Sequence, residues 1–119
     1  MGELESALDA LAAEDLDGMV APQLLDRTRF LLWLRNRADA ELARTVRRCE
    51  TTQAPEQDGL ASMRSWLRGH ARLSAREAQR VVSNGRVIEQ LPALAAAHTA
   101  GEVTAEQVAT IAPVAAPDV

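Results

Sequence analysis

Apolar and polar positions alternate along most of this chain with the three- and four-residue spacing of amphipathic helices. Residues 3–14 show this spacing, with acidic side chains between the apolar ones, and predict a short first helix. A break that contains Gly18 follows. Pro22 and Asp26 are then typical of the first turns of a helix. The pattern beyond them predicts one long helix over residues 22–50.

The long predicted helix carries an apolar stripe and a run that is apolar on every side. The stripe is expected to comprise Leu24, Leu31, Ala38, Leu42 and Cys49, with a flanking row at Leu25, Leu32 and Val46. The run is residues 30–34, and atoms from elsewhere must cover it all round. The cover comes either from the same domain or from a homodimer or a missing C-terminal domain. In the second case the candidate interface residues are Phe30, Leu32, Trp33 and Leu34.

Two helices joined by a short turn are predicted between residues 59 and 91. Residues 51–58 are polar and predict a loop, and a third helix follows over residues 59–70. After a turn over residues 71–73, Ser74 opens the fourth helix, where Glu77 completes a Ser-x-x-Glu capping box. The buried side of this helix should comprise Ala78, Val81, Val82, Gly85, Ile88 and Leu91. The two helices form a helix-turn-helix-like pair.

The remaining chain predicts two shorter helices. Pro92 opens an alanine-rich segment that Gly101 ends, and Thr104 repeats the helix-start pattern as Thr-x-x-Gln before residues 105–112. Pro113 should end that last helix. Residues 113–119 then form a tail, interpreted as the start of a linker or of a missing C-terminal region. We therefore predict an all-α fold of about six helices, with a single domain over residues 1–112.

Composition supports helices and argues against a metal or disulfide scaffold. The chain has 119 residues, 23 of them alanine, and its only aromatic residues are Phe30, Trp33 and Trp66. Small side chains favour closely packed helices. One cysteine and two histidines exclude a Cys/His zinc cage within one chain, and we expect neither a metal nor a cofactor. Cys49 is interpreted as a packed thiol, and His98 as a surface or capping residue.

The N-terminus opens with acidic residues, where a signal peptide would carry positive charge. No apolar run approaches the roughly 20 residues that cross a bilayer. We therefore expect a soluble cytoplasmic protein with no membrane partner.

Charge is distributed unevenly along the chain. Residues 1–26 carry seven acids and no base, whereas residues 27–49 carry seven arginines and two acids. Residues 59–88 carry six arginines and one acid, and the net charge of the whole chain is −4. All thirteen basic residues are arginine. A uniformly basic nucleic-acid binder is thereby excluded, but a local basic face is not.

The helix-turn-helix-like pair suggests where such a face would be. In that motif the first residues of the second helix meet base edges. Here these residues are Arg76, Gln79, Arg80 and Ser83, with Asn84 beside them, and their types include those that read guanine and adenine. Arg64, Arg68 and Arg72 could hold phosphates on either side. The alternative is that these arginines only keep an apolar-faced helix soluble.

Several short sequences in the chain resemble one known family. They are the run from Arg35 to Glu41, Ser65-Trp66-Leu67, Leu73-Ser74-x-x-Glu77-Ala78, Leu91-Pro92, and Gly101-Glu102-Val103-Thr104-x-x-Gln107. Over about residues 24–112 the chain resembles the actinobacterial domain of unknown function 222. That resemblance implies an all-helical domain that precedes a metal-dependent nuclease module of the HNH endonuclease-like type. It also implies DNA contact, because a companion domain can deliver a nuclease to its substrate.

The sequence-based hypothesis is thus a non-catalytic helical domain that binds duplex DNA. The histidines and asparagine of the HNH module would lie beyond residue 119, so we expect no nuclease activity from this chain alone. The alternative is a helical protein-interaction or homodimerisation module without nucleic-acid contact. A free-standing enzyme is a weaker third hypothesis, because no catalytic constellation stands out among the residues.

Overall fold

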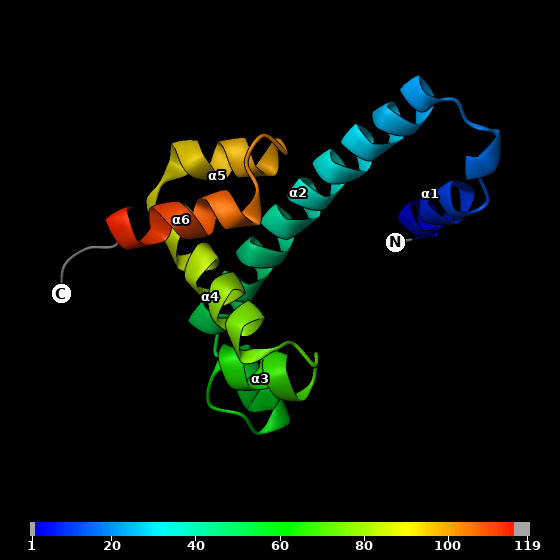
Figure 1. Ribbon diagram of the computed structural model, residues 1–119. Coiled ribbons are helices and arrows are strands. Elements are labelled where there is room, and N and C mark those ends of the chain that lie inside the picture. Colours follow the sequence, from blue (N-terminus) through cyan, green and yellow to red (C-terminus); the bar gives the residue numbers. More distant parts are fainter. Residues whose placement is uncertain (1, 116–119) are drawn as a thin grey trace. The chain divides into compact units, whose positions relative to one another are not determined.

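The computed structural model describes residues 2–115, with their side chains described through residue 111. Over this range it contains eight helical elements and no strand, which confirms the predicted all-α class. Along the chain they are α1 (Gly2–Ala12), η1 (Leu16–Gly18), α2 (Ala21–Thr51), η2 (Ala54–Asp58), α3 (Met63–Gly69), α4 (Ala75–Gln90), α5 (Pro92–Thr99) and α6 (Ala105–Ala115), where η marks a 3-10 helix (Figure 1). The long predicted helix is confirmed as α2.

The chain separates into two compact units, Met1–Leu31 and Leu32–Val119, and the boundary lies within α2. Polar contacts join the helices of the first unit, where no residue of α1 is buried. Arg27 donates one hydrogen bond to Glu14, 3.0 Å, and another to the carbonyl of Leu11, 2.8 Å. The prediction of a single domain over residues 1–112 stays a prediction.

The start of α3 differs from the sequence-based prediction. Residues 59–62 are not helical, and Ser62 is the true N-cap, because its hydroxyl accepts a hydrogen bond from the backbone N–H of Ser65 at 3.2 Å. The predicted loop before it contains the short helix η2, which includes the buried Pro55. The indole of Trp66 donates to Asp58 at 2.6 Å and ties this segment to α3.

The two predicted capping boxes have different outcomes. Thr104 and Gln107 form the reciprocal pair of hydrogen bonds in full, at 2.9 and 3.0 Å. At the start of α4, the Ser74 hydroxyl accepts the Glu77 N–H at 3.1 Å, as predicted. The carboxylate of Glu77 turns instead to Arg80, so only half of that box forms. An arginine one turn away has outcompeted the backbone N–H for the glutamate.

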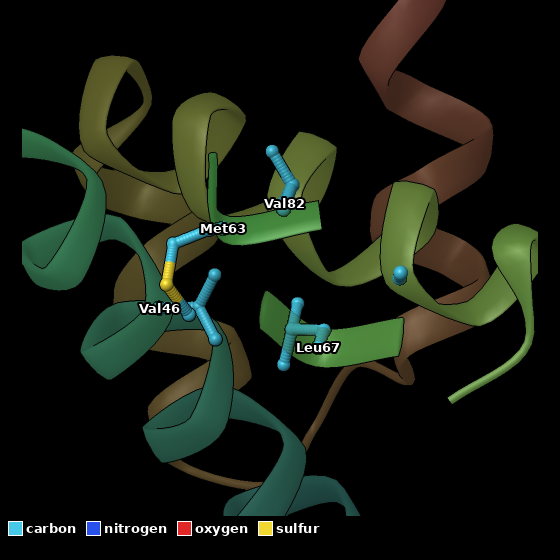
Figure 2. Packing of buried hydrophobic residues seen from close by; sticks show 5 residues of the cluster. Val46, Met63, Leu67 and Val82 are labelled. Carbon is cyan, nitrogen blue, oxygen red and sulfur yellow. The ribbon is translucent and has the colours of Figure 1, made fainter. Parts of the chain in front are cut away.

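Helix α4 is the central element of the second unit. It packs against α3, α5 and α6, and its apolar side chains enter two separate clusters. One cluster comprises Ala43, Val87, Ile88 and Val108, and the other comprises Val46, Met63, Leu67, Ala78 and Val82. Figure 2 shows Val46, Met63, Leu67 and Val82 of the second cluster converging from α2, α3 and α4. Cys49 packs against this cluster, as expected for a packed thiol.

The buried face of α2 is not the predicted stripe. Its buried residues are Ala40, Ala43 and Val46, whereas Leu24 and Leu42 are exposed. Ala38 of the predicted stripe is also exposed, whereas Val46, predicted for the flanking row, is buried. At Ala43 the small side chain allows the backbone of α4 to approach closely.

Gly85 is the closest point of that approach. A Cβ added there would lie 2.7 Å from the carbonyl oxygen of Ala43 and 3.1 Å from the Cβ of Arg47. Real Cβ atoms do not approach a backbone oxygen so closely, and neither neighbour is the end of a flexible side chain. Gly85 therefore sets the distance at which α4 crosses α2.

Part of the apolar run at residues 30–34 is covered by the same unit. The indole of Trp33 donates to the carbonyl of Ala100 at 3.0 Å, and the guanidinium of Arg37 lies 5.2 Å from the Trp33 ring centroid. Gly101 has φ +82°, and an added Cβ would lie 2.7 Å from Trp33. Trp33 nevertheless remains 40% exposed and Leu32 45% exposed, so the cover is incomplete.

Two predictions near the C-terminus are wrong. His98 is fully buried, which contradicts the surface alternative of its prediction, and its Nδ1 lies 2.9 Å from the carbonyl oxygen of Val103. This contact joins the end of α5 to the segment before α6, and no local sequence pattern predicts it. Helix α6 continues past Pro113 to Ala115. Only two helical residues follow Pro113, so the proline disturbs no more than the last turn of the helix. Residues 116–119 of the predicted tail lie outside the described range.

Within residues 2–115, none of the helices combines the length and the apolarity that crossing a membrane requires.

The contact at Gly85 predicts that Gly85→Ala destabilises the protein. Overpacking costs about 1–3 kcal/mol, whereas alanine gains roughly 1 kcal/mol over glycine in a helix. Because the nearest atom is a fixed backbone oxygen, we expect a net loss of about 1–2 kcal/mol in the free energy of unfolding. Urea denaturation followed by circular dichroism measures it. The control is Gly69→Ala, where nothing lies within 4 Å and stability should hold or rise.

Candidate nucleic-acid interface

The pair α3–α4 brings together most of the residues predicted to contact DNA. A hollow of about 340 Å³ lies between the two helices, and we call it the α3–α4 hollow. Its lining residues are Ser62, Arg64, Ser65, Arg68, Ala75 and Gln79. Two arginines line this hollow and no acid does, so its charge suits an anion.

A direct contact joins the predicted phosphate set to the predicted base-reading set. Arg64 of α3 donates to the side-chain oxygen of Gln79 on α4 at 2.6 Å. The amide nitrogen of Gln79 stays available as a donor. Sequence reasoning assigned Arg64 and Gln79 to one DNA-binding surface but did not predict this bond.

Three further arginines of the predicted set are exposed. Among the residues that the structure describes, no hydrogen bond or ion pair engages the side chains of Arg68, Arg72 and Arg76. Arg72 has φ +60°, a left-handed conformation that usually favours glycine. An arginine thus adopts a backbone conformation in this turn that glycine would adopt more easily, at some cost in strain.

Arg80 occupies a different environment from Arg76. Its side chain is only 28% exposed, donates to Glu77 at 3.1 Å, and lies 4.0 Å from Glu106 of α6. With Arg76, Gln79 and Ser83 it lines a larger hollow of about 740 Å³, which we call the α4–α6 hollow. Among the described residues, two carboxylates thus lie within ion-pair distance of Arg80 and none within that distance of Arg76. The prediction that Arg80 and Ser83 face bases stays a prediction.

Asn84 was expected beside the base-reading residues, and the structure corrects this. It is 2% exposed, and its amide nitrogen donates to the carbonyl of Ala105 at 3.0 Å. The bond ties the middle of α4 to the start of α6. Because α4 is covered on two sides, by α2 with α3 and by α6, its exposed face is narrower than an amphipathic pattern suggests.

Two other arginines, Arg47 and Arg86, are bonded to carboxylates of the protein and do not belong to the candidate interface. Arg47 of α2 donates two hydrogen bonds to Glu89 of α4, both 2.9 Å, and a third to Glu50 at 3.2 Å. Arg86 of α4 donates to the two oxygens of Glu50 at 2.6 and 3.2 Å. The hydrogen bonds with Glu89 raise the pKa of Arg47, and those from Arg47 lower the pKa of Glu89. Periodicity suggested neither pair between α2 and α4, because the partners are 42 and 36 positions apart.

No group of three or more His, Cys, Asp and Glu side chains that could hold a metal ion is found within the described part of the chain. His70 lies at the C-terminal end of α3, and its ring stacks on Trp66 with 5.6 Å between centroids.

The model of one protein family matches residues 28–116, and its description reads "Domain of unknown function (DUF222)". Neither a curated protein nor a solved structure matches the chain.

The Arg47–Glu89 pair predicts an acid-sensitive contribution to stability. A carboxylate whose pKa is lowered by folding stabilises the protein above its unfolded pKa, about 4.3, and loses this effect as pH falls through the folded value. Glu89→Gln should therefore lower stability at pH 7. The difference from the wild type should shrink as pH falls below about 4.3.

Urea denaturation at pH 7, 5 and 3 tests this. The control at pH 7 is Glu56→Gln, which removes a carboxylate that takes part in no ion pair within the described residues and should leave the midpoint unchanged. If wild type and Glu89→Gln differed in the free energy of unfolding by the same amount at pH 7 and pH 3, the stabilising role of the Arg47–Glu89 pair would be contradicted.

Proposed function

The chain belongs to the family described as domain of unknown function 222, and we propose that it is a helical domain that binds duplex DNA through α3 and α4 without catalysing a reaction itself. In this proposal Arg64, Arg68 and Arg72 hold phosphates. Gln79 and Ser83 of α4 meet base edges. Arg76, predicted from the sequence to face bases, joins the phosphate contacts in this proposal, and Arg80 lies at the edge of the interface.

The observation that carries the proposal is the bond between Arg64 and Gln79. The bond holds Arg64, whose guanidinium suits a phosphate, against Gln79, whose amide suits a base edge, and both residues line the α3–α4 hollow. In helix-turn-helix proteins the same division of labour positions the second helix in the major groove. With its oxygen engaged by Arg64, Gln79 would present its amide N–H groups to base acceptors.

The distribution of carboxylates supports a particular orientation on DNA. Arg68, Arg72 and Arg76 are exposed and have no carboxylate within ion-pair distance in the described structure, so they are the groups best able to replace counterions on phosphates. Arg80 already has Glu77 and Glu106 beside it, which would repel phosphates. We therefore assign the N-terminal end of α4 and the turn before it to the DNA backbone, and Arg80 to the edge of the interface.

The proposal extends to the parent protein. The sequence resemblance supports a longer cytoplasmic protein of the HNH endonuclease-like type from an actinobacterium, in which this domain targets the nuclease to DNA. That step rests on family analogy, so DNA binding by the present chain is the part that is tested directly.

A second candidate function is protein interaction through α2. Leu32 is 45% exposed and Leu42 is also exposed, although both are large apolar residues on one helix. Such exposure can mark a contact with another chain. Trp33 is a poor test of this idea, because its indole also holds the α5–α6 turn through Ala100.

DNA binding predicts a steep dependence of affinity on salt. If five or six phosphates are contacted, the logarithm of the association constant should fall against the logarithm of salt concentration with a slope of about −5. Arg68→Ala combined with Arg76→Ala should weaken binding about 10–100-fold near 0.1 M salt and make the slope less steep by about 2. Fluorescence anisotropy with a labelled duplex measures both quantities.

The matched control is Arg44→Ala, which removes an exposed arginine of α2 that pairs with Glu41. It should leave both the affinity and the slope near the wild-type values. A flat salt response, or an equal loss in the control and the double variant, argues against the proposed surface.

A dimer that buries Leu32 should dissociate when this residue is charged. Leu32→Asp is then expected to halve the mass to that of a monomer, 12.9 kDa, in multi-angle light scattering. Thr45→Asp, an exposed polar position on the same helix, should leave the mass unchanged. A wild-type chain that is monomeric at all concentrations would remove the self-association version of this second function.

A further inference from the structure

A polar pocket of about 370 Å³ lies where α2, α4 and the start of α6 meet. Its lining includes Arg35, Asn36 and Asp39 of α2, Glu77 and Arg80 of α4, and Glu106 of α6. We call it the polar pocket. It is distinct from the α3–α4 hollow, because no residue lines both.

Several polar groups around the polar pocket lack a partner within the described structure. The side chains of Arg35 and Asp39 engage in no hydrogen bond or ion pair there. The Nε of Arg80 and the Oδ1 of Asn36 are buried without any hydrogen-bond partner. The Nη1 of Arg80 lies 4.0 Å from Glu106, too far for a hydrogen bond. Of these groups only the Arg80 Nε and the Asn36 Oδ1 are buried. Arg35 is exposed and Asp39 is half-buried, so their charged side chains can be reached by a polar ligand in the pocket.

The charges of the lining restrict that occupant. Two guanidinium groups face three carboxylates, so a phosphate would meet more negative charge than positive. The carboxylates of Asp39, Glu77 and Glu106 do not form a group that could hold a metal ion. The lining therefore suits a neutral group that offers hydrogen-bond donors to a carboxylate and an acceptor to an arginine. A pocket of this volume has room for a nucleobase.

We propose that the polar pocket binds the Watson–Crick edge of an unpaired guanine. Guanine is the base whose neutral edge carries two adjacent donors, N1–H and N2–H, next to the acceptor O6. The carboxylate of Asp39 would accept from the two donors, and Arg80 would donate to O6. The planar guanidinium of Arg35 can stack on the base, as arginine does in single-stranded nucleic-acid sites. The Nε of Arg80 is closed off until its side chain rotates, so binding includes such a rotation.

The position of the polar pocket connects it to the proposed DNA surface, and the inference rests on that function. Glu77, Arg80 and Glu106 line both the polar pocket and the α4–α6 hollow. A strand held by Arg76 and Gln79 is therefore next to the entrance. Moving a paired base out of a duplex costs a few kcal/mol, so bulged or single-stranded guanines are the favoured ligands.

Calorimetric titration of the full chain with deoxynucleoside monophosphates tests the pocket directly. We expect dGMP to bind at least about tenfold more tightly than dAMP, dCMP and dTMP. The inosine nucleotide dIMP lacks the N2 amino group, so its affinity should be lower than that of dGMP and higher than that of the other three nucleotides. Asp39→Asn, which keeps the shape of the side chain, should abolish the preference for dGMP. Asp9→Asn, at an exposed position of α1, should retain it.

The remaining outcomes overturn the proposal. One is equal binding of all four nucleotides. Another is a dGMP affinity so weak that no binding is detected at a nucleotide concentration of about 10 mM. The third is an Asp39→Asn variant that still prefers dGMP as strongly as the wild type does. Any of these would assign the unpaired polar atoms to ordered water. Duplex affinity is a separate measurement that Asp39→Asn should not change. Loss of duplex binding with dGMP selectivity intact would refute the proposed function but not the pocket.

Discussion

The close crossing of α4 over α2 at Gly85 is the contact on which the rest of the second unit depends. Because Gly85 has no side chain, α4 approaches the backbone of Ala43 and lies deep between its neighbours. Its other sides then reach α3 and α6, and the two apolar clusters form on either side of the crossing. Two ion pairs also join α2 to α4, Arg47 with Glu89 and Glu50 with Arg86, and Arg47 pairs with Glu50 within α2.

The candidate DNA surface follows from this burial. With most of α4 covered, its exposed side is a narrow strip that begins at the turn after α3. Arg76 and Gln79 lie on this strip, and Arg64 and Arg68 border it from α3. Burial also decides which arginines remain for a ligand. Arg47 and Arg86 are engaged by carboxylates of the protein, and Arg80 is shared between two hollows.

Local patterns predicted much of this fold because helix starts and stops are short-range events. Ser74, Pro92, Gly101 and Thr104 act on backbone groups within one turn, so their positions in the sequence are sufficient. The start of α3 was missed because Ser62 was not recognised as a cap. The predicted phosphate and base residues share a hollow because α3 and α4 are adjacent in the chain and joined by a tight turn.

The amino-acid pattern alone was enough to establish the all-helical class, the long α2, the position of the capped α4 and the arginine-rich character of the α3–α4 pair. The packing of the helices was needed to show which face of α2 is buried, that Asn84 and His98 lie inside, and which arginines are neutralised. The physical reason is distance along the chain. Periodicity reports which side of a helix is apolar, but close approach and ion pairing depend on helices that are tens of residues apart, and no local pattern contains them.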